Sequence, residues 1–320
     1  MRDTPIVVVE QLHKRYRVAC NSISAVCDLS FEIAAGEALV LLGANGAGKS
    51  TTVSIIATLL KPDAGLVLVA GADVVQRPDA ARRCLGVALQ IAGLPRRQTA
   101  RRLLHHHARL HGMSASDTRS RVAEVIERFD LGAIADRSIS TYSGGQRQRL
   151  HIALALIHHP LVALLDEPTT GLDTRSRQIV WTELRAQLAA GTTLLFTTHD
   201  LHEAEANAHR VAIISRGTLV AHRHTEDLKR ELGSRTVTLS FMNRREAQRA
   251  LELVGRGELS NGSEAKLALV GERDALDVIR LLAAHEVDIN TISIVEPTLE
   301  SIFNQLTSEQ HPPVTAERQL

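Results

Sequence analysis

Residues 43–50 read Gly43-Ala44-Asn45-Gly46-Ala47-Gly48-Lys49-Ser50, which fits the pattern G-x-x-x-x-G-K-[ST] without a mismatch. An apolar run at 37–42 precedes this stretch, and a helical pattern at 49–60 follows it. Glycines in such a loop let backbone N–H groups turn inward around phosphate oxygens, and the N-terminal end of the helix adds a favourable field. We therefore predict a nucleotide phosphate loop between a buried strand and a helix. Lys49 would bridge the β- and γ-phosphates, and Ser50 would offer its hydroxyl to Mg²⁺.

Strand-like and helical patterns alternate on both sides of this loop, which predicts an α/β fold with a P-loop NTPase core. From 99 to 159 apolar residues recur at helical spacing with no intervening strand, so we expect an inserted helical subdomain at about 92–160. The core domain is expected to span 1–230. Its strands are expected at 5–10, 25–33, 37–42, 66–69, 85–89, 161–165, 193–198 and 211–215.

A different pattern begins after residue 230. Strand, helix, two strands around the turn Asn261-Gly262, helix and strand follow one another between 235 and 295. This βαββαβ order predicts a small α+β accessory module at 231–307, ferredoxin-like and closed by a helix at 297–306. The polar end at 308–320, which contains Pro312-Pro313, is expected to be disordered.

The composition limits the partners of the chain. A formal net charge of only +1 argues against nucleic acid as a partner. No apolar run reaches the roughly 18 residues that span a bilayer, so we expect any membrane-spanning part to belong to another polypeptide. The scattered cysteines Cys20, Cys27 and Cys84 form no CxxC pair, which is typical of a protein in a reducing cytosol.

Two carboxylates end the predicted strand at 161–165. The carboxyl ends of parallel strands are where open α/β sheets bind ligands. Asp166 would hold Mg²⁺ directly or through water, and Glu167 would polarise the attacking water as general base. The alternative is an acidic turn before Pro168, but the phosphate loop favours the catalytic interpretation.

The run TYSGGQRQRL at 141–150 is the most specific stretch of the chain. A serine and two glycine N–H groups at a helix start form an anion site, although a plain N-cap is the alternative for Ser143. The run resembles the signature motif of ABC ATPases. The resemblance implies a head-to-tail homodimer or pseudo-dimer with two ATP molecules at its interface. In it, the γ-phosphate held by one subunit's loop would meet the other subunit's signature residues, namely Ser143, Gly144, Gly145 and Gln146.

Other positions match the same family in order. Gln90 resembles the glutamine that senses Mg²⁺ and the attacking water, and His199 resembles the switch histidine at the γ-phosphate. Asp173 resembles the key residue of the loop that signals across the dimer, and Tyr16 resembles the aromatic residue that stacks on adenine, with plain packing as the alternative. The resemblance thus implies catalytic residues Glu167, His199 and Gln90, Mg²⁺ ligands Ser50, Gln90 and Asp166, and ATP contacts from Tyr16, the loop at 43–50 and Thr51.

A narrower resemblance links the chain to the daunorubicin-resistance type of exporter ATPase. It rests on Tyr142 and on the stretches at 197–204 and 296–303, while Gln146-Arg147 departs from the Met-Arg that is frequent in that type. It implies a peripheral subunit on the cytoplasmic face of the cell membrane. There its ATP hydrolysis would power a separate transmembrane permease that exports a drug-like or lipid-like hydrophobic compound.

Two other classes remain as alternatives. A soluble ABC protein working in repair, translation or cluster assembly would need no membrane partner, but such proteins usually carry a second ATPase unit or a long coiled-coil insertion. A P-loop kinase or GTPase would lack the signature run together with Gln90 and His199.

Two histidine runs receive no catalytic role. His105, His106 and His107 point in different directions on a helix and predict a solvated face, whereas His158-His159 would interact with a helix dipole.

Overall fold

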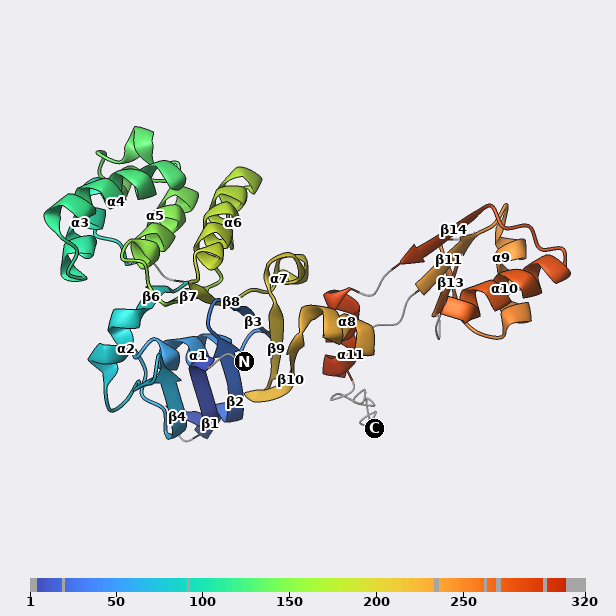
Figure 1. The fold of residues 1–320 in the computed structure, drawn as a ribbon. Helices are drawn as coiled ribbons and strands as arrows, with labels where there is room; N and C mark the ends of the chain where they lie inside the picture. Colours follow the sequence, from blue (N-terminus) through green and yellow to red (C-terminus); the bar gives the residue numbers. More distant parts are fainter. Residues whose placement is uncertain are drawn as a thin grey trace, which may run out of the picture. The chain divides into compact units, whose positions relative to one another are not determined.

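The computed structural model describes residues 5–18, 21–90, 93–232, 236–261, 264–268, 272–295 and 298–308. The chain divides into two compact units, Met1–Thr225 and Glu226–Leu320 (Figure 1). Within the described residues, no helix is long and apolar enough to cross a membrane.

A six-stranded sheet in the order β10-β9-β3-β8-β7-β6 forms the centre of the first unit. Its strands are parallel apart from β10, which pairs antiparallel with β9. Every residue of the three central strands is buried, as expected of a parallel sheet covered on both faces. The bounds are β3 Ala38–Leu42, β6 Leu85–Ala88, β7 Val162–Asp166, β8 Thr193–Thr197, β9 Arg210–Ser215 and β10 Thr218–His224.

A second, antiparallel sheet in the order β2-β1-β4-β5 completes the core of this unit. Its strands are β1 Pro5–Val18, β2 Asn21–Ala34, β4 Ala64–Val69 and β5 Ala72–Asp73. Helix α1, Lys49–Ile56, buries Val53, Ile55 and Ile56 in one apolar cluster with residues of both sheets. The helix that follows the phosphate loop is therefore fixed from both sides, and the short α2, Pro78–Cys84, leads into β6.

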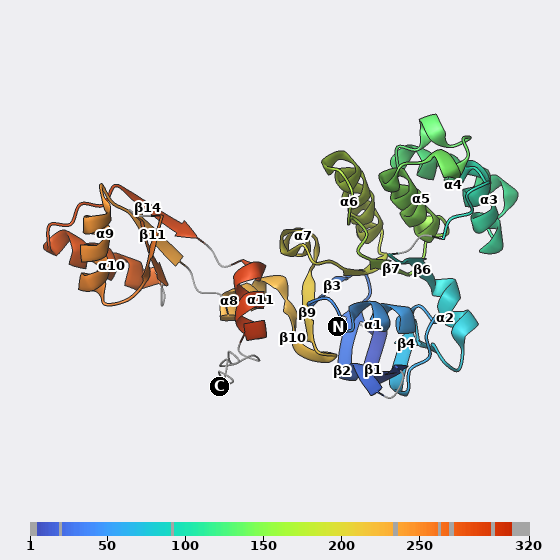
Figure 2. The ribbon, with the colours of Figure 1, turned by 180° about the vertical axis from the view of Figure 1, so that it is seen from behind.

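The predicted helical insertion is present between β6 and β7. It contains α3 Ala100–Leu110, α4 Ala115–Arg128, two 3₁₀ turns and α5 Gly144–Leu156. These helices lie together, apart from β1, β2 and β4 (Figures 1 and 2). The remaining helices of the unit are α6 Thr174–Ala189 and α7 Leu201–Asn207.

The second unit contains the predicted ferredoxin-like arrangement. Its antiparallel sheet has the order β12-β13-β11-β14, which is the order that a βαββαβ chain gives in that fold. The two helices α9 and α10 pack an apolar cluster that includes Leu239, Ala250, Leu267 and Leu282. The elements are α8 Thr225–Leu232, β11 Thr236–Ser240, α9 Arg244–Val254, β12 Glu258–Ser260, β13 Glu264–Ala268, α10 Glu272–Ala284, β14 Thr291–Val295 and α11 Leu299–Ser308.

Several predicted boundaries are wrong. β1 continues to Val18 rather than to residue 10, because it pairs with β2 along its whole length despite its polar residues. α1 ends at Ile56 instead of residue 60, because Thr58 has a left-handed φ of 62°. Residue 308, expected in the tail, ends α11, and the rest of that predicted tail lies outside the described residues.

Candidate functional site

The phosphate loop connects β3 to α1 and needs its glycines for geometric reasons. Gly48 has φ 105°, and a Cβ there would lie 2.3 Å from the carbonyl oxygen of Ala25. Gly46 also has a left-handed φ, of 81°. The backbone N–H of Gly217 donates to the Ala47 carbonyl at 3.0 Å, which ties the loop to the turn between β9 and β10. The loop is therefore a preformed backbone cradle rather than a mobile connection.

Lys49 lies buried inside this cradle. Its Nζ donates to the carbonyl oxygens of Gly43 at 2.7 Å and Ala44 at 3.2 Å. Burial lowers the pKa of Lys49 from its ordinary value, and the nearby Glu167 and Asp166 carboxylates partly oppose this shift. The ammonium group is thus held at the loop, where it is available to phosphate oxygens.

The two carboxylates at the end of β7 have different environments. Asp166 is buried and accepts a hydrogen bond from Thr197 Oγ1 at 2.5 Å. Glu167 leaves the strand with a left-handed φ of 50°, and its backbone N–H donates to Thr197 Oγ1 at 2.9 Å. This backbone turn directs Glu167 away from the strand, while Asp166 stays fixed by the neighbouring β8.

The structure brings three side chains together around the carboxylate of Glu167. Thr170 Oγ1 donates to its Oε2 at 2.9 Å, and Gln90 Nε2 donates to the same oxygen at 3.5 Å. His199 Nδ1 lies 3.4 Å from the other oxygen, Oε1. Gln90, Glu167 and His199 come from the ends of three adjacent strands, β6, β7 and β8, so the parallel sheet produces this convergence.

The signature residues open helix α5. Ser143 is its N-cap, with Oγ accepting from the Gln146 N–H at 3.2 Å, and Gln146 Oε1 accepts in return from the Ser143 N–H at 2.9 Å. This reciprocal capping confirms that a helix begins at Ser143. Gly144 and Gly145 form its first turn. An anion that approaches this end meets the positive pole of the helix.

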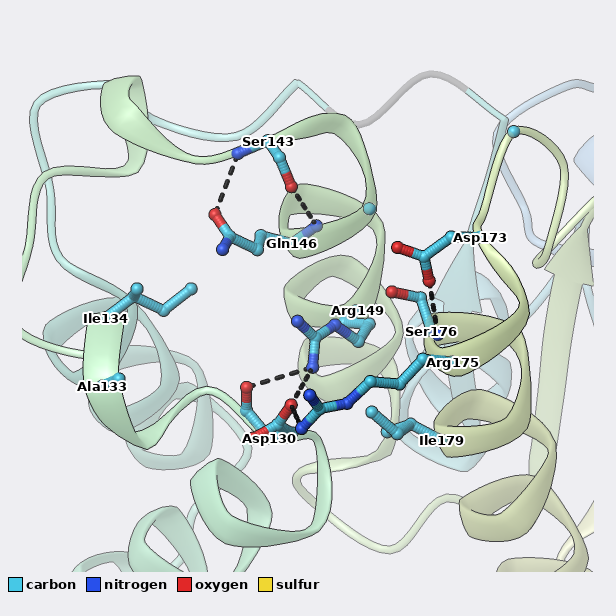
Figure 3. A pocket seen from close by; sticks show the side chains of 12 residues that line it. Asp130, Ala133, Ile134, Ser143, Gln146, Arg149, Asp173, Arg175, Ser176 and Ile179 are labelled. Carbon is cyan, nitrogen blue, oxygen red and sulfur yellow. Dashed lines mark hydrogen bonds and ion pairs between the residues drawn. The ribbon is translucent and has the colours of Figure 1, made fainter.

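A cavity of about 540 Å³ lies between this helix start and α6 (Figure 3). Ser143, Gln146 and Arg149 of α5 line one side, and Asp173 and Ser176 line the other. Asp173 is the N-cap of α6 and accepts from the Ser176 N–H at 2.7 Å. This hydrogen bond lowers the pKa of Asp173 below its ordinary range, so the residue is a carboxylate at neutral pH.

Tyr16 lies beside the phosphate loop, and of the predicted Mg²⁺ ligands Ser50 belongs to the loop, Asp166 lies near Lys49 and Gln90 contacts Glu167. Tyr16 is 40% exposed, and its hydroxyl lies 3.5 Å from Thr51 Oγ1, so the ring is accessible next to the first turn of α1. Ser50, Gln90 and Asp166 offer hydroxyl, amide and carboxylate oxygens, which are the donors that Mg²⁺ prefers. The residues present therefore fit Mg²⁺.

A buried polar network lies behind the site and was not predicted from the sequence. Glu203 of α7 accepts hydrogen bonds from Trp181 Nε1 at 2.5 Å, from Thr198 Oγ1 at 2.9 Å and from Thr169 Oγ1. It thereby joins the residue before His199 to the loop that contains Asp173. Trp181 is buried and also donates the first of these hydrogen bonds. A hydrogen-bonded tryptophan in an apolar stripe gives no signal in the sequence.

Comparison with known proteins gives consistent results. A family model described as ABC transporter matches residues 26–170. The chain is 40% identical over 298 residues to the daunorubicin/doxorubicin resistance ATP-binding protein DrrA of Streptomyces peucetius, covering 91% of this chain and 90% of the relative. It is 36% identical to the doxorubicin resistance ATP-binding protein of Mycobacterium tuberculosis H37Rv, over 96% of this chain and 95% of that one. It is 41% identical over 198 residues to the Nod factor export ATP-binding protein I of Paraburkholderia xenovorans, over 62% of this chain and 65% of that one.

Solved structures resemble the first unit. The ATP-binding subunit of an ABC transporter matches with a TM-score of 0.66 at 27% identity, covering 71% of this chain and 93% of that one. A dimeric ATP-binding cassette in a post-hydrolysis state with ADP and Pi matches with a TM-score of 0.64 at 27% identity, covering 68% and 98%. These similarities confirm the predicted fold class and the predicted family resemblance.

Proposed function

Because this chain belongs to the family of ABC transporter ATP-binding proteins and is an ATPase, we propose that it drives export of a hydrophobic compound through a separate membrane subunit. The observation that carries the proposal is the convergence of Gln90 and His199 on Glu167. Lys49 lies close enough to Glu167 for the two charges to interact. The same few side chains thus combine phosphate binding with activation of water.

Each residue has a distinct task in the proposed reaction. Glu167 takes the proton of the attacking water, and His199 steadies the γ-phosphate while it is transferred. Lys49 and the backbone N–H groups of residues 46–50 stabilise the phosphate charge. Ser50, Gln90 and Asp166 would hold Mg²⁺, which when bound neutralises charge on the phosphates.

The second half of each nucleotide site is proposed to come from another copy of the subunit. Ser143 and Gly145 line the cavity beside Asp173, whereas Lys49 is held by the carbonyl oxygens of its own phosphate loop. A dimeric cassette is among the structures similar to this chain. We infer a homodimer or pseudo-dimer in which the signature end of α5 completes the partner's phosphate loop, with Asp173 at the contact between the two sites.

The compound class rests on the relatives. Two relatives similar over nearly the whole chain are named for daunorubicin or doxorubicin resistance, and a third for Nod factor export. A drug-like or lipid-like hydrophobic compound is therefore the proposed cargo, and the cytoplasmic face of the cell membrane is the proposed location.

Glu167→Gln tests the catalytic part of this proposal. The variant should bind ATP normally and accumulate as an ATP-bound dimer, with hydrolysis reduced by about 10²- to 10⁴-fold because the general base is lost. Size-exclusion chromatography with ATP measures the ATP-bound dimer, and a phosphate-release assay measures hydrolysis. Glu127→Gln, at an exposed position of α4, is the matched control. Near-normal hydrolysis by Glu167→Gln would remove the role given to this residue.

Co-expression with a membrane protein that is encoded by a neighbouring gene tests the transport part of the proposal. ATP-dependent efflux of a fluorescent anthracycline should require wild-type Glu167 in this setting. Efflux that is unchanged by Glu167→Gln, or a subunit that does not co-purify with membrane protein, would favour the soluble ABC class instead.

A further inference from the structure

Three histidines gather in the helical subdomain, outside the nucleotide site. His107 lies in the last turn of α3, His111 is the C-cap residue of that helix, and His158 follows α5. One ring nitrogen of each lies within 4.8 Å of those of the other two. The members of the consecutive run at 105–107 diverge, and only His107 of that run belongs to the cluster. The cluster instead combines a spacing of four residues on one helix with a residue from a different segment.

His158 has a defined tautomer. Its Nε2 lies 3.1 Å from the carbonyl oxygen of Leu85, and because a carbonyl only accepts, Nε2 carries the proton. Its Nδ1 therefore holds a lone pair, and that buried atom has no hydrogen-bond partner among the described residues. Metal-binding histidines typically donate their other N–H to a backbone carbonyl in this way. The Leu85 contact thus prepares Nδ1 to bind an ion.

The other two rings are close to binding positions. The centroids of His107 and His111 lie 4.9 Å apart, and His111 stacks on His158 at 3.6 Å. Ligand nitrogens around a tetrahedral ion lie about 3.3 Å apart, given metal–nitrogen distances of about 2.0–2.1 Å. His111 is exposed, so its ring can rotate off the stack without disturbing the core. The lone pairs of parallel rings do not converge, so His111 must rotate off the stack to direct a nitrogen at the ion that His107 and His158 hold.

We propose that His107, His111 and His158 bind a divalent transition-metal ion of the Zn²⁺ type. Three imidazoles suit Zn²⁺ and do not suit Mg²⁺ or Ca²⁺, which prefer oxygen ligands. The exposed side at His111 leaves a fourth position open to water. The site differs in ligand chemistry from the oxygen donors beside the phosphate loop, so the two ions are discriminated.

The protonation state of the cluster supports metal binding. Burial, helped by repulsion among the neighbouring histidines, lowers the pKa of His107 and of His158 to about 4. The imidazoles of His107 and His158 are thus neutral at physiological pH, and their lone pairs are free for a cation.

A bound ion would connect two segments that carry different parts of the molecule. α3 would be joined at its C-terminal end to the segment after α5, and through Leu85 to the start of β6. α5 begins with the signature residue Ser143. The ion would therefore stabilise the end of α5 that lies opposite to the signature, and it acts on the helical subdomain rather than on hydrolysis itself.

Metal titration of the full-length, tag-free protein tests the proposal. Isothermal titration of chelator-treated protein with Zn²⁺ should show one site that weakens by at least about tenfold in His107→Ala and in His111→Ala. His106→Ala is the matched control, because His106 is exposed on the same helix and outside the cluster. It should bind Zn²⁺ like the wild type.

Two further measurements keep the result unambiguous. Co²⁺ in place of Zn²⁺ should give the intense visible absorption of a tetrahedral site in the wild type and in His106→Ala only. Hydrogen exchange at the end of α3 should slow with Zn²⁺ in the wild type and not in His111→Ala, while circular dichroism verifies that each variant folds. Equal Zn²⁺ affinity of the wild type and His107→Ala, or Co²⁺ spectra typical of six-coordinate aqueous ion, would overturn the proposal.

Discussion

The residue that links most of the catalytic segments is Glu203, which contacts none of the proposed phosphate ligands directly. Its two carboxylate oxygens accept from Trp181, Thr198 and Thr169 on three different elements. Thr198 directly precedes His199, and Thr169 belongs to the loop that contains Asp173. A buried acceptor of this kind fixes the relative positions of two segments, and removing it leaves several donors unsatisfied.

Glu203→Gln is expected to disturb hydrolysis without disturbing ATP binding. The amide presents an NH₂ group to donors that need an acceptor, so His199 loses its support. We expect kcat to fall by about tenfold with little change in KM, and the free energy of unfolding to fall by about 1–3 kcal/mol. Steady-state ATPase kinetics and urea titration measure these effects.

Trp181→Phe separates packing from hydrogen bonding at the same place. It keeps most of the apolar contact with Phe196, whose ring centroid lies 5.1 Å away, and removes the N–H donor. Because Glu203 keeps its other two donors, kcat should fall less than in Glu203→Gln. A larger loss in Trp181→Phe would mean that packing, rather than the carboxylate, positions His199.

His222 predicts how stability depends on pH. Burial, followed by repulsion from Arg210, lowers its pKa from 6.5 to about 4. Between these values the unfolded chain binds more protons than the folded one, so stability is lost as pH falls from 6.5 towards 4. Urea titrations across this range should show a smaller loss in His222→Gln, by at most about 1.4 kcal/mol per pH unit. His105→Gln, at an exposed position of α3, should follow the wild type.

Single residues were predictable from the sequence where a local motif names them. Glu167 and Ser143 belong to short patterns with a physical rationale, and the structure places each at the end of the expected element. Thr170 and Thr197 carry no such pattern, although they hold Glu167 and Asp166 in position. The contact of Thr197 with Asp166 joins positions that are distant in sequence, and the contact of Thr170 with Glu167 depends on one backbone turn. Neither property is visible in composition or spacing.

Among the elements, β6 and α5 approach each other unusually closely. A Cβ at Gly86 of β6 would lie 1.9 Å from the carbonyl oxygen of Ala155 in α5 and 2.8 Å from Pro160 Cγ. Only a residue without a side chain fits there. The approach sets the distance between the helix that begins at Ser143 and the strand that leads to Gln90.

Gly86→Ala should therefore be strongly destabilising. The added methyl group must move either backbone, which costs about 1–3 kcal/mol or more in a packed core. Gly132→Ala, where nothing lies within 4 Å of the added Cβ, should leave the free energy of unfolding nearly unchanged. Urea titration measures the free energy of unfolding of both variants. Similar values for Gly86→Ala and Gly132→Ala would contradict the close approach of β6 and α5.

Element types were predicted better than element ends. The three buried central strands of the six-stranded sheet were recognisable as apolar runs, and the order of strands and helices predicted after residue 235 is the order that the structure has. The second half of β1 was missed because its residues alternate poorly and contain Lys14 and Arg15. Pairing with β2 supplies the hydrogen bonds there, so tertiary structure outweighs local preference.

At the scale of the whole molecule, the proposed sites each need two copies of the chain. A variant in which Lys49 is replaced, and a variant in which a bulky residue replaces Ser143, should each lack ATPase activity when present alone. A mixture contains dimers in which one site is intact, because the functional loop of one copy meets the functional signature of the other.

Mixing Lys49→Ala with Ser143→Arg should accordingly restore part of the ATPase activity. Equimolar protein should reach up to about a quarter of the wild-type rate, since half of the dimers are mixed and each has one intact site of two. Each variant alone at the same total concentration is the control. A mixture no more active than its components, although cross-linking shows mixed dimers, would argue against sites shared between subunits.

The division of the chain into units followed from the change of pattern near residue 230, and the structure divides it at Thr225. The role of the second unit, by contrast, could not be predicted from the sequence. A ferredoxin-like module is used for many purposes, so its fold carries no function by itself. In the described residues, the proposed catalytic groups and the histidine cluster all belong to the first unit.

The reciprocal cap at Ser143 has a bearing on how the motor would reset. The Oγ of Ser143 accepts from the Gln146 N–H, and its own O–H stays available as a donor, so a phosphate can bind at this helix start without breaking the cap. The cap already fixes the serine before a nucleotide arrives, so binding orders little that was free. Once the terminal phosphate has left, the charge-assisted hydrogen bond is lost while the cap remains, and the closed dimer becomes less stable.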